Sequence, residues 1–76
     1  MKNVYYEVEI MKLFIRGYNP VHRFLSEDVA RGFFYKIIDA ETEAVLYRIE
    51  EINSSYFCKY PLDIGGGSKE VNWNGN

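Results

Sequence analysis

The sequence is poor in the residues that most often mark catalysis or cross-linking. Its 76 residues include one cysteine, Cys58, and one histidine, His22. A single cysteine cannot form a disulfide within the chain, which is typical of proteins from a reducing compartment. The Cys/His pair could support nucleophilic chemistry only if the two side chains met in space. Cys58 lies in an apolar run, where free cysteines are usually inert packing residues.

Long apolar runs are also missing. No segment approaches the ~20 apolar residues of a membrane-spanning helix. Glu7 and Glu9 interrupt the apolar residues near the N-terminus, so a signal-peptide core is not expected there. We therefore expect a soluble, cytoplasmic protein with no membrane partner.

Motifs for phosphate or metal binding are absent as well. The glycine run at 65–67 precedes Ser68 and Lys69 in an order that differs from Gly-x-x-x-x-Gly-Lys-Ser/Thr. Two carboxylate pairs are closely spaced, Glu7 with Glu9 and Glu41 with Glu43. Without a histidine or cysteine cluster they make a weak site for a hard cation at most. We expect no catalytic residue, no cofactor and no metal, and hence a protein that is not an enzyme.

Apolar and aromatic residues are plentiful in this short chain. Hydrophobic residues make up 47% of it and aromatic residues 17%, with seven Tyr, five Phe and one Trp. A chain of this length forms one domain and buries only about 60% of its unfolded surface. The aromatic residues are more than one small core needs, and Tyr and Trp are enriched at binding hot spots. A surface that faces another protein is therefore expected.

Charge is unevenly distributed along the chain. The formal net charge of −2 argues against a dedicated nucleic-acid-binding protein. Residues 1–36 carry six basic and four acidic residues, whereas residues 39–51 carry five acidic residues and Arg48. The second segment is either an acidic binding surface or an ordinary solvated face.

The stretch from Ser26 to Asp39 is the strongest structural signal, and we interpret it as a helix. Ser26 is a good N-cap, and the two acids that follow it complement the positive end of the helix dipole. An apolar stripe then recurs with helical spacing at Val29, Ala30, Phe33, Phe34, Ile37 and Ile38. Gly32, inside the helix, either allows close approach of another backbone or is merely tolerated.

An alternative interpretation makes residues 33–39 a strand that forms a hairpin with residues 43–50, since Phe, Tyr and Ile favour strands. The cap, the charges and the periodicity together favour the helix. A helix running on to Ile52 would place Glu41 and Arg48 near the middle of the apolar stripe, so we expect it to end near Ala40.

Three further segments are predicted to be strands. Val4 to Ile10 alternates with polar residues, Val45 to Ile49 alternates in the same way, and Tyr56 to Tyr60 is ended by Pro61. Residues 16–20 read as a loop and residues 21–25 as the connection back to the helix. The prediction is an α+β fold with one helix packed on a three- to four-stranded antiparallel sheet, in the order β-α-β-β.

Domain limits follow from composition. Residues 1–64 are expected to form a single α+β domain. Residues 65–76 are expected to form a Gly-rich flexible tail that docks, if at all, through Trp73.

The layout resembles that of known small proteins. A strand, a polar helix start with Ala30 before an aromatic run, and the alternating strand Val45-Leu46-Tyr47-Arg48-Ile49 follow one another. In size and layout this resembles small proteins of bacteria and their phages, including compact inhibitors of host defence complexes. The resemblance covers about half of the chain and transfers no functional residue.

Two binding functions are consistent with these features. The first is a non-enzymatic protein-interaction module, such as an inhibitor or accessory protein of a phage or mobile element that binds a host protein complex. The second is a nucleic-acid-binding accessory protein that uses a basic-aromatic loop. The candidate residues for protein binding are Glu41, Glu43, Tyr47, Glu50 and Glu51, and those for nucleic-acid binding are Arg16, Tyr18, Arg23 and Arg31.

Self-association is a third expectation. The predicted strand 56–60 is a candidate for a sheet edge, and an exposed edge can pair with another chain. We therefore expect a homodimer through residues 56–60.

Overall fold

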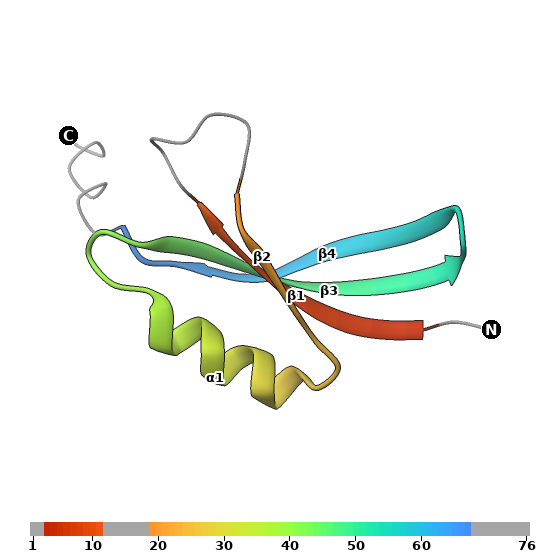
Figure 1. Ribbon diagram of the computed structural model, residues 1–76, viewed down its shortest axis with the longest axis horizontal. Helices are drawn as coiled ribbons and strands as arrows, with labels where there is room; N and C mark the ends of the chain where they lie inside the picture. The colour runs from red at the N-terminus through yellow and green to blue at the C-terminus, as the bar shows by residue number, and fades with distance from the viewer. Residues whose placement is uncertain (1–2, 12–18, 68–76) are drawn as a thin grey trace.

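The computed structural model describes residues 3–11 and 19–67. Two antiparallel strand pairs are joined by one helix (Figure 1). The elements are β1 (Asn3–Met11), β2 (Val21–Phe24), α1 (Glu27–Ile37), β3 (Glu43–Asn53) and β4 (Tyr56–Gly65). All four strands belong to one antiparallel sheet with the spatial order β2-β1-β3-β4. The α+β class predicted from the sequence is confirmed.

The predicted element order is wrong in one respect, because a second strand precedes the helix. The observed order is β-β-α-β-β, not β-α-β-β. Residues 21–25 were expected to be a connection, but Val21–Phe24 pairs with β1 as β2. A strand of four residues is too short for alternation to distinguish it from a loop, and pairing with β1 decides its conformation.

The helix forms where its cap and charges predict. The Ser26 side chain accepts a hydrogen bond from the Val29 backbone N–H at 3.4 Å, and Glu27 begins the helix. The helix ends at Ile37, slightly before the expected end near Ala40. Residues 33–37 are helical, so the alternative in which 33–39 forms a strand is wrong.

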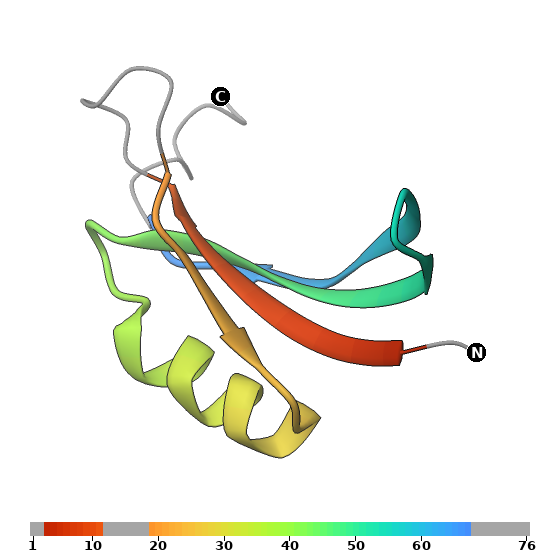
Figure 2. The same cartoon turned by 45° about the vertical axis from the view of Figure 1, so that its right-hand side comes forward.

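The helix covers one face of the sheet only (Figure 2). The core between them consists of Val8, Ala30, Phe34, Ala44 and Leu46, all buried. Phe33, Ile37 and Ile38 pack against this core from the predicted apolar stripe. Val29, also expected in the stripe, is 58% exposed, so the buried stripe is narrower than predicted.

Most of the last strand lies outside the cover of the helix. Among the described residues, α1 has backbone contacts with β1, β2 and β3 but none with β4. Side chains reach across instead. The Tyr35 hydroxyl donates to Asp63 Oδ2 at 2.9 Å, and Arg31 lies 3.6 Å from the same oxygen. At the end of β4, the side chains of Phe34 and Ile38 lie beside Gly65. Beyond the N-terminal end of α1, the β3–β4 hairpin extends further than the helix (Figure 1).

β4 is longer than predicted. It was expected to end at Pro61, but it continues to Gly65 with a bulge at Leu62, where Leu46 pairs with Asp63 and Tyr47 with Pro61. Proline is tolerated because β4 is an edge strand, where no partner needs its missing N–H.

Residues 65–67, expected to belong to a tail, have defined places in the domain. The Gly67 N–H donates to the Asp39 carbonyl at 2.8 Å. Gly66 has a φ of +89°, and a Cβ atom there would lie 1.9 Å from the Thr42 carbonyl oxygen. Only glycine fits this position. Residues 68–76, including Trp73, lie outside the described residues.

Gly32, in contrast to Gly66, has open space around its Cα atom. A Cβ atom at this position would meet nothing within 4 Å. The suggestion that Gly32 allows another part of the chain to approach closely is therefore wrong for the described structure.

Replacing Gly66 with alanine is expected to lower the free energy of unfolding by about 2 kcal/mol or more. The new methyl group would clash with the Thr42 backbone, and the alanine would have to keep the left-handed φ of Gly66. Urea denaturation of both proteins measures the difference. A change below about 0.5 kcal/mol would contradict the close approach.

Gly32→Ala is the matched control in the helix. It should raise the free energy of unfolding by about 0.5–1 kcal/mol, because alanine restricts the unfolded chain and meets no obstacle in the fold. The same denaturation experiment measures it. Destabilisation would show that the space above Gly32 is occupied.

Candidate functional site

The sheet has a face that no described element covers, and we call it the open face. Successive side chains of a strand point to opposite faces, so the neighbours of the core residues Val8 and Leu46 point away from α1. All four strands contribute to the open face. Its members include Tyr5, Glu7, Glu9, Val21, Arg23, Glu43, Val45, Tyr47, Ile49, Glu51, Phe57, Lys59 and Ile64.

A buried carboxylate lies at the centre of this face. Glu7 on β1 is only 8% exposed, and the register places it between Arg23 on β2 and Tyr47 on β3. Arg23 Nη2 lies 3.0 Å from Glu7 Oε2, and Lys59 Nζ on β4 lies 3.8 Å from Glu7 Oε1. Each carboxylate oxygen therefore has its own cation, which compensates the loss of hydration on burial.

The same two cations hold aromatic rings. The Arg23 guanidinium lies 4.7 Å from the centre of the Tyr5 ring, and Lys59 Nζ lies 4.3 Å from the centre of the Tyr47 ring. Both distances suit cation–π attraction. The five residues Tyr5, Glu7, Arg23, Tyr47 and Lys59 thus form one connected unit across four strands, which we call the Glu7 cluster.

The electrostatic surroundings of Tyr47 disfavour its ionised form. Burial raises the pKa of the Tyr47 hydroxyl, and the neighbouring carboxylates of Glu9 and Glu7 raise it further. Tyr47 therefore remains a neutral phenol over the whole physiological pH range.

The open face is acidic in total. Its described residues include four carboxylates, Glu7, Glu9, Glu43 and Glu51, against the cations Arg23 and Lys59. Glu9 Oε2 accepts a hydrogen bond from Asn19 at 2.9 Å. Since Glu7 is bound by both cations, the remaining carboxylates determine the sign of the surface.

The structure divides the residues predicted to bind protein. Glu43, Tyr47 and Glu51 lie on the open face. Glu50 lies on the helix side of the sheet, where it pairs with Arg48 at 3.0 Å. Glu41 is exposed in the turn between α1 and β3, and its N–H donates to the Asp39 side chain.

The two described residues that were predicted to bind nucleic acid lie on different sides of the sheet. Arg23 is bound to Glu7 on the open face. Arg31 belongs to α1, on the other side of the sheet, and lies 3.0 Å from Glu27. Arg16 and Tyr18 lie outside the described residues.

The two candidate reactive side chains are separated. His22 is on β2 and Cys58 on β4, at opposite edges of the sheet. Three strand spacings alone separate them by about 14 Å, and Cys58 lies opposite Glu50, four residues along β3 from the level of His22, which increases the separation further. The His22 ring packs instead against Phe33, with ring centres 4.8 Å apart. A Cys/His site therefore does not form from these residues.

Residues 3–11 and 19–67 contain neither a metal site nor a membrane-spanning helix. No group of three His, Cys, Asp or Glu side chains lies close enough to hold a metal ion. Nor does any helix of that part of the chain have the length and apolar character needed to cross a membrane.

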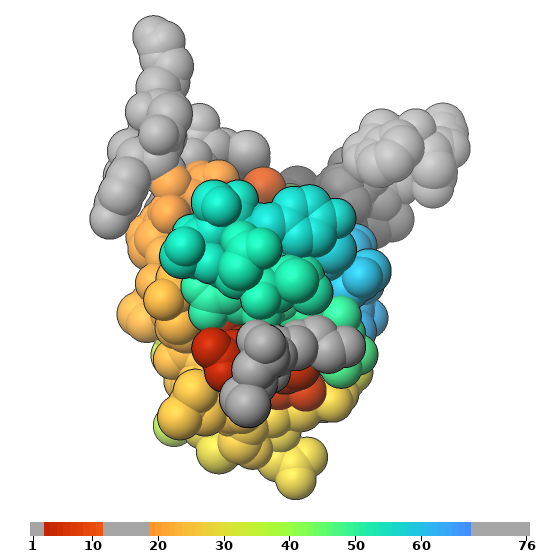
Figure 3. All heavy atoms as spheres, turned by 90° about the vertical axis from the view of Figure 1, so that its right-hand side faces the viewer, coloured from red at the N-terminus to blue at the C-terminus, as the bar shows by residue number. Residues whose placement is uncertain are grey.

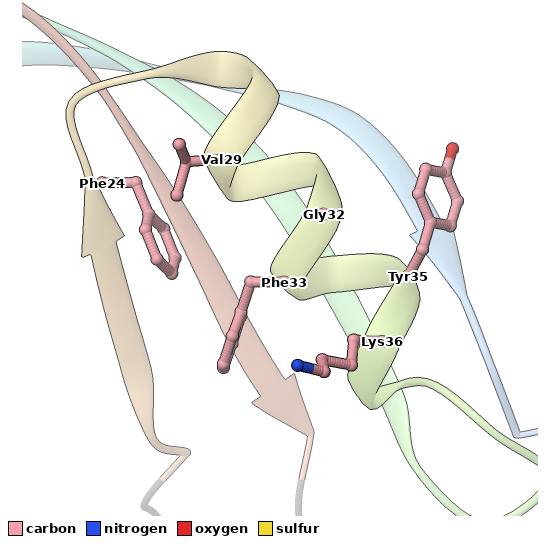
Figure 4. A pocket seen from close by; sticks show the side chains of 6 residues that line it. All are labelled: Phe24, Val29, Gly32, Phe33, Tyr35 and Lys36. Carbon is pink, nitrogen blue, oxygen red and sulfur yellow. The ribbon is translucent and has the colours of Figure 1, made fainter.

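An open depression lies beside the helix, and few polar groups line it. It measures about 670 Å³ and is lined by Phe24, Val29, Gly32, Phe33, Tyr35 and Lys36. Figure 4 shows Tyr35 pointing away from the two phenylalanines, so the polar groups do not converge. This depression therefore does not form a site.

Sequence reasoning missed three members of the Glu7 cluster, Tyr5, Glu7 and Lys59, as functional residues. Tyr5 and Glu7 were visible as the outer positions of an alternating strand. The sequence did not show the strand order. In the sheet, β2 with Arg23 lies beside β1, and β4 with Lys59 lies beside β3.

Comparison with protein-family models, curated proteins and solved structures found no match for this chain. The functional argument therefore rests on the geometry of the open face.

Removing the two cations should destabilise the fold more than removing the carboxylate. Arg23→Gln with Lys59→Gln leaves a buried charge unpaired and is expected to cost about 1–3 kcal/mol of unfolding free energy. Glu7→Gln leaves two cations that can turn to water, and should cost less than about 1 kcal/mol. Urea denaturation measures both variants.

The triple variant is the control for this comparison. Adding Glu7→Gln to the double variant should recover part of the lost stability, because the unpaired carboxylate is gone. Additive losses in the triple variant would contradict the pairing.

Stability should fall in strongly alkaline solution, partly because of Tyr47. Its raised pKa means that the folded state holds the proton more tightly than the unfolded state. The resulting stabilisation is complete below about pH 10 and is lost as the pH rises through the folded-state pKa. Tyr47→Phe should make this alkaline fall shallower in denaturation curves recorded between about pH 9 and pH 11. Equal slopes in the two proteins would contradict it.

Proposed function

We propose that this chain is a small, non-enzymatic protein-interaction module that binds a basic surface of a partner protein through its open face. The observation that carries the proposal is the Glu7 cluster, in which Tyr5 and Tyr47 are held by cations among carboxylates on an uncovered face.

Preorganisation supports binding as the role of this cluster. Tyrosine and arginine are enriched at the residues that contribute most to protein interfaces. Binding costs less conformational entropy when the contacting side chains are already ordered. Tyr5 and Tyr47 are ordered in this way, since each ring has a cation fixed by Glu7.

The sign of the charge indicates the kind of partner. Glu9, Glu43 and Glu51 extend from one end of the open face to the other, along β1 and β3. An acidic face gains specificity and association rate from a complementary basic patch. The surface of a protein that normally binds nucleic acid is one such patch.

The biological setting is proposed from the size and layout of the chain alone. A cytoplasmic inhibitor or accessory protein of a phage or mobile element, acting on a host protein complex, would need a compact domain with one binding face. The open face is suited to this role because the helix stabilises the sheet entirely from its other side.

Nucleic-acid binding is the second candidate function. Tyr5 and Tyr47 lie on the two central strands, and aromatic side chains on such sheets can stack on bases. Arg23 and Lys59 are the cations available beside them, but both are shared with Glu7. The acidic total of the face places this candidate second.

The two candidates are separated by affinity capture from a lysate of the native host, with and without nuclease. We expect a stoichiometric protein that survives nuclease and is released at high salt. Glu43→Gln with Glu51→Gln, both on the open face, should reduce capture at least about tenfold, which corresponds to about 1.4 kcal/mol.

The matched control is Glu41→Gln with Glu50→Gln. It changes the net charge by the same amount, but these residues lie off the open face. Equal loss in the two variants would make the effect one of net charge and would contradict the proposal. Loss of the captured material on nuclease treatment would favour nucleic acid.

A further inference from the structure

The outer edge of β4 exposes aromatic side chains on both faces of the sheet. Tyr56 is 57% exposed, Phe57 58% and Tyr60 45%. Phe57 lies on the open face, and Tyr56 and Tyr60 lie with Cys58 on the helix side, where α1 does not reach. Figure 3 shows β4 and β2 on opposite flanks of the molecule, so this edge is accessible.

Between Phe57 and Tyr60 the edge lacks the devices that usually prevent strand pairing. A lysine commonly protects an edge by projecting outwards. Lys59 turns back over its own sheet instead, toward Glu7 and Tyr47. The other edge strand, β2, has only four residues, so it offers much less backbone for pairing.

Pro61 determines which peptide groups point outwards. Proline has no N–H, so an edge strand accommodates it where that group would face solvent. The pairing with β3 is regular from Phe57 to Pro61, so orientation alternates along this segment. The free N–H and C=O groups of Phe57 and Lys59 therefore also point outwards, whereas those of Cys58 point toward β3.

We propose that β4 pairs with β4 of a second copy of this chain, antiparallel, about a two-fold axis at Cys58. In this register Phe57 of one copy lies opposite Lys59 of the other, and these residues exchange backbone hydrogen bonds. This pairing goes beyond the proposed function, since it uses the edge of the sheet and leaves the centre of the open face free.

Charge and backbone chemistry select this register over its neighbours. An axis at Lys59 would set two lysines directly opposite each other, which is unfavourable. An axis at Tyr60 would pair Lys59 with Pro61, which cannot donate a hydrogen bond. With the axis at Cys58, neither occurs.

The side chains are self-complementary in the same register. On the helix side, Tyr56 lies opposite Tyr60 of the second copy, and Cys58 lies opposite Cys58. Aromatic pairs across antiparallel strands are stabilising. On the open face, Lys59 lies opposite Phe57. The dimer would contain one continuous sheet of eight strands.

The paired segment is short, and this limits its affinity. Stable interfaces bury at least about 1,200 Å² in total, and the pairing of one short segment from each copy is expected to bury less. We therefore expect a dimer that forms in the micromolar range and dissociates on dilution. Sedimentation velocity over a range of concentrations measures this equilibrium directly, and a monomer at every concentration would overturn the proposal.

The lone cysteine allows the register to be tested by cross-linking. Cys58 and its counterpart form a pair that is not hydrogen-bonded, for which Cα atoms lie about 4.5 Å apart, within disulfide range. Diamide takes two electrons and two protons from the two thiols and is reduced to the hydrazine as the disulfide forms. We expect a covalent dimer on non-reducing gels, at protein concentrations where free collision gives little product.

Relocated cysteines supply the controls in a Cys58→Ser background. Tyr56→Cys and Tyr60→Cys should each cross-link poorly alone, but well when the two proteins are mixed. His22→Cys, on β2, should not cross-link. Strong cross-linking of Tyr60→Cys alone would overturn the register, and equal cross-linking at all positions would overturn the pairing. Circular dichroism of each variant confirms that it is folded.

Discussion

A single helix is too narrow to cover a four-stranded sheet, and this constraint determines the remaining surfaces of the molecule. With its side chains a helix is about 10–12 Å across, whereas four strands span about 14 Å between the outer strand axes alone. The helix α1 lies over β1, β2 and β3, and β4 is linked to it through Asp63. One whole face and one edge of the sheet are left without a cover among the described elements.

On the open face, charged and aromatic side chains shield apolar residues that no helix covers. Ile49 is only 1% exposed although no helix packs on it, because the long side chains around it shield it. Tyr5 and Lys59 lie directly opposite Ile49 on the two neighbouring strands, and the cation–π contacts hold their side chains across the sheet. The Glu7 cluster therefore stabilises the sheet and also orders its surface, so the same contacts serve the fold and the proposed binding.

Local signals in the sequence predicted the parts of the fold that depend on local interactions. Ser26, the acids after it and the apolar periodicity located α1, and alternation located β1 and β3. β2 was not predicted, because four residues are too few to show the alternation of a strand. The composition of the Gly-rich run at 65–67 indicates a tail, because composition alone does not show that Gly66 packs against Thr42.

The candidate site was less predictable because it depends on strand order. Tyr47, Glu43 and Glu51 were identified from the acidic segment, but Glu7 and Lys59 were not. They meet only because β1 and β3 are the central strands, with β2 and β4 at their sides. Hairpin rules predict the pairing of strands that are adjacent in sequence, whereas the pairing of β1 with β3 brings together residues far apart in the chain.

The pairing of β1 with β3 also has a kinetic consequence. β1–β2 and β3–β4 each join segments that are close in sequence, whereas Met11 pairs with Glu43 and Asn3 with Glu51 across about 30 to 50 residues. The entropic cost of loop closure is therefore largest for the step in which the β1–β2 hairpin pairs with the β3–β4 hairpin. The helix α1 lies between these halves in the sequence and packs on strands from both. It therefore shortens the effective loop between β1 and β3 and stabilises their pairing once it has formed.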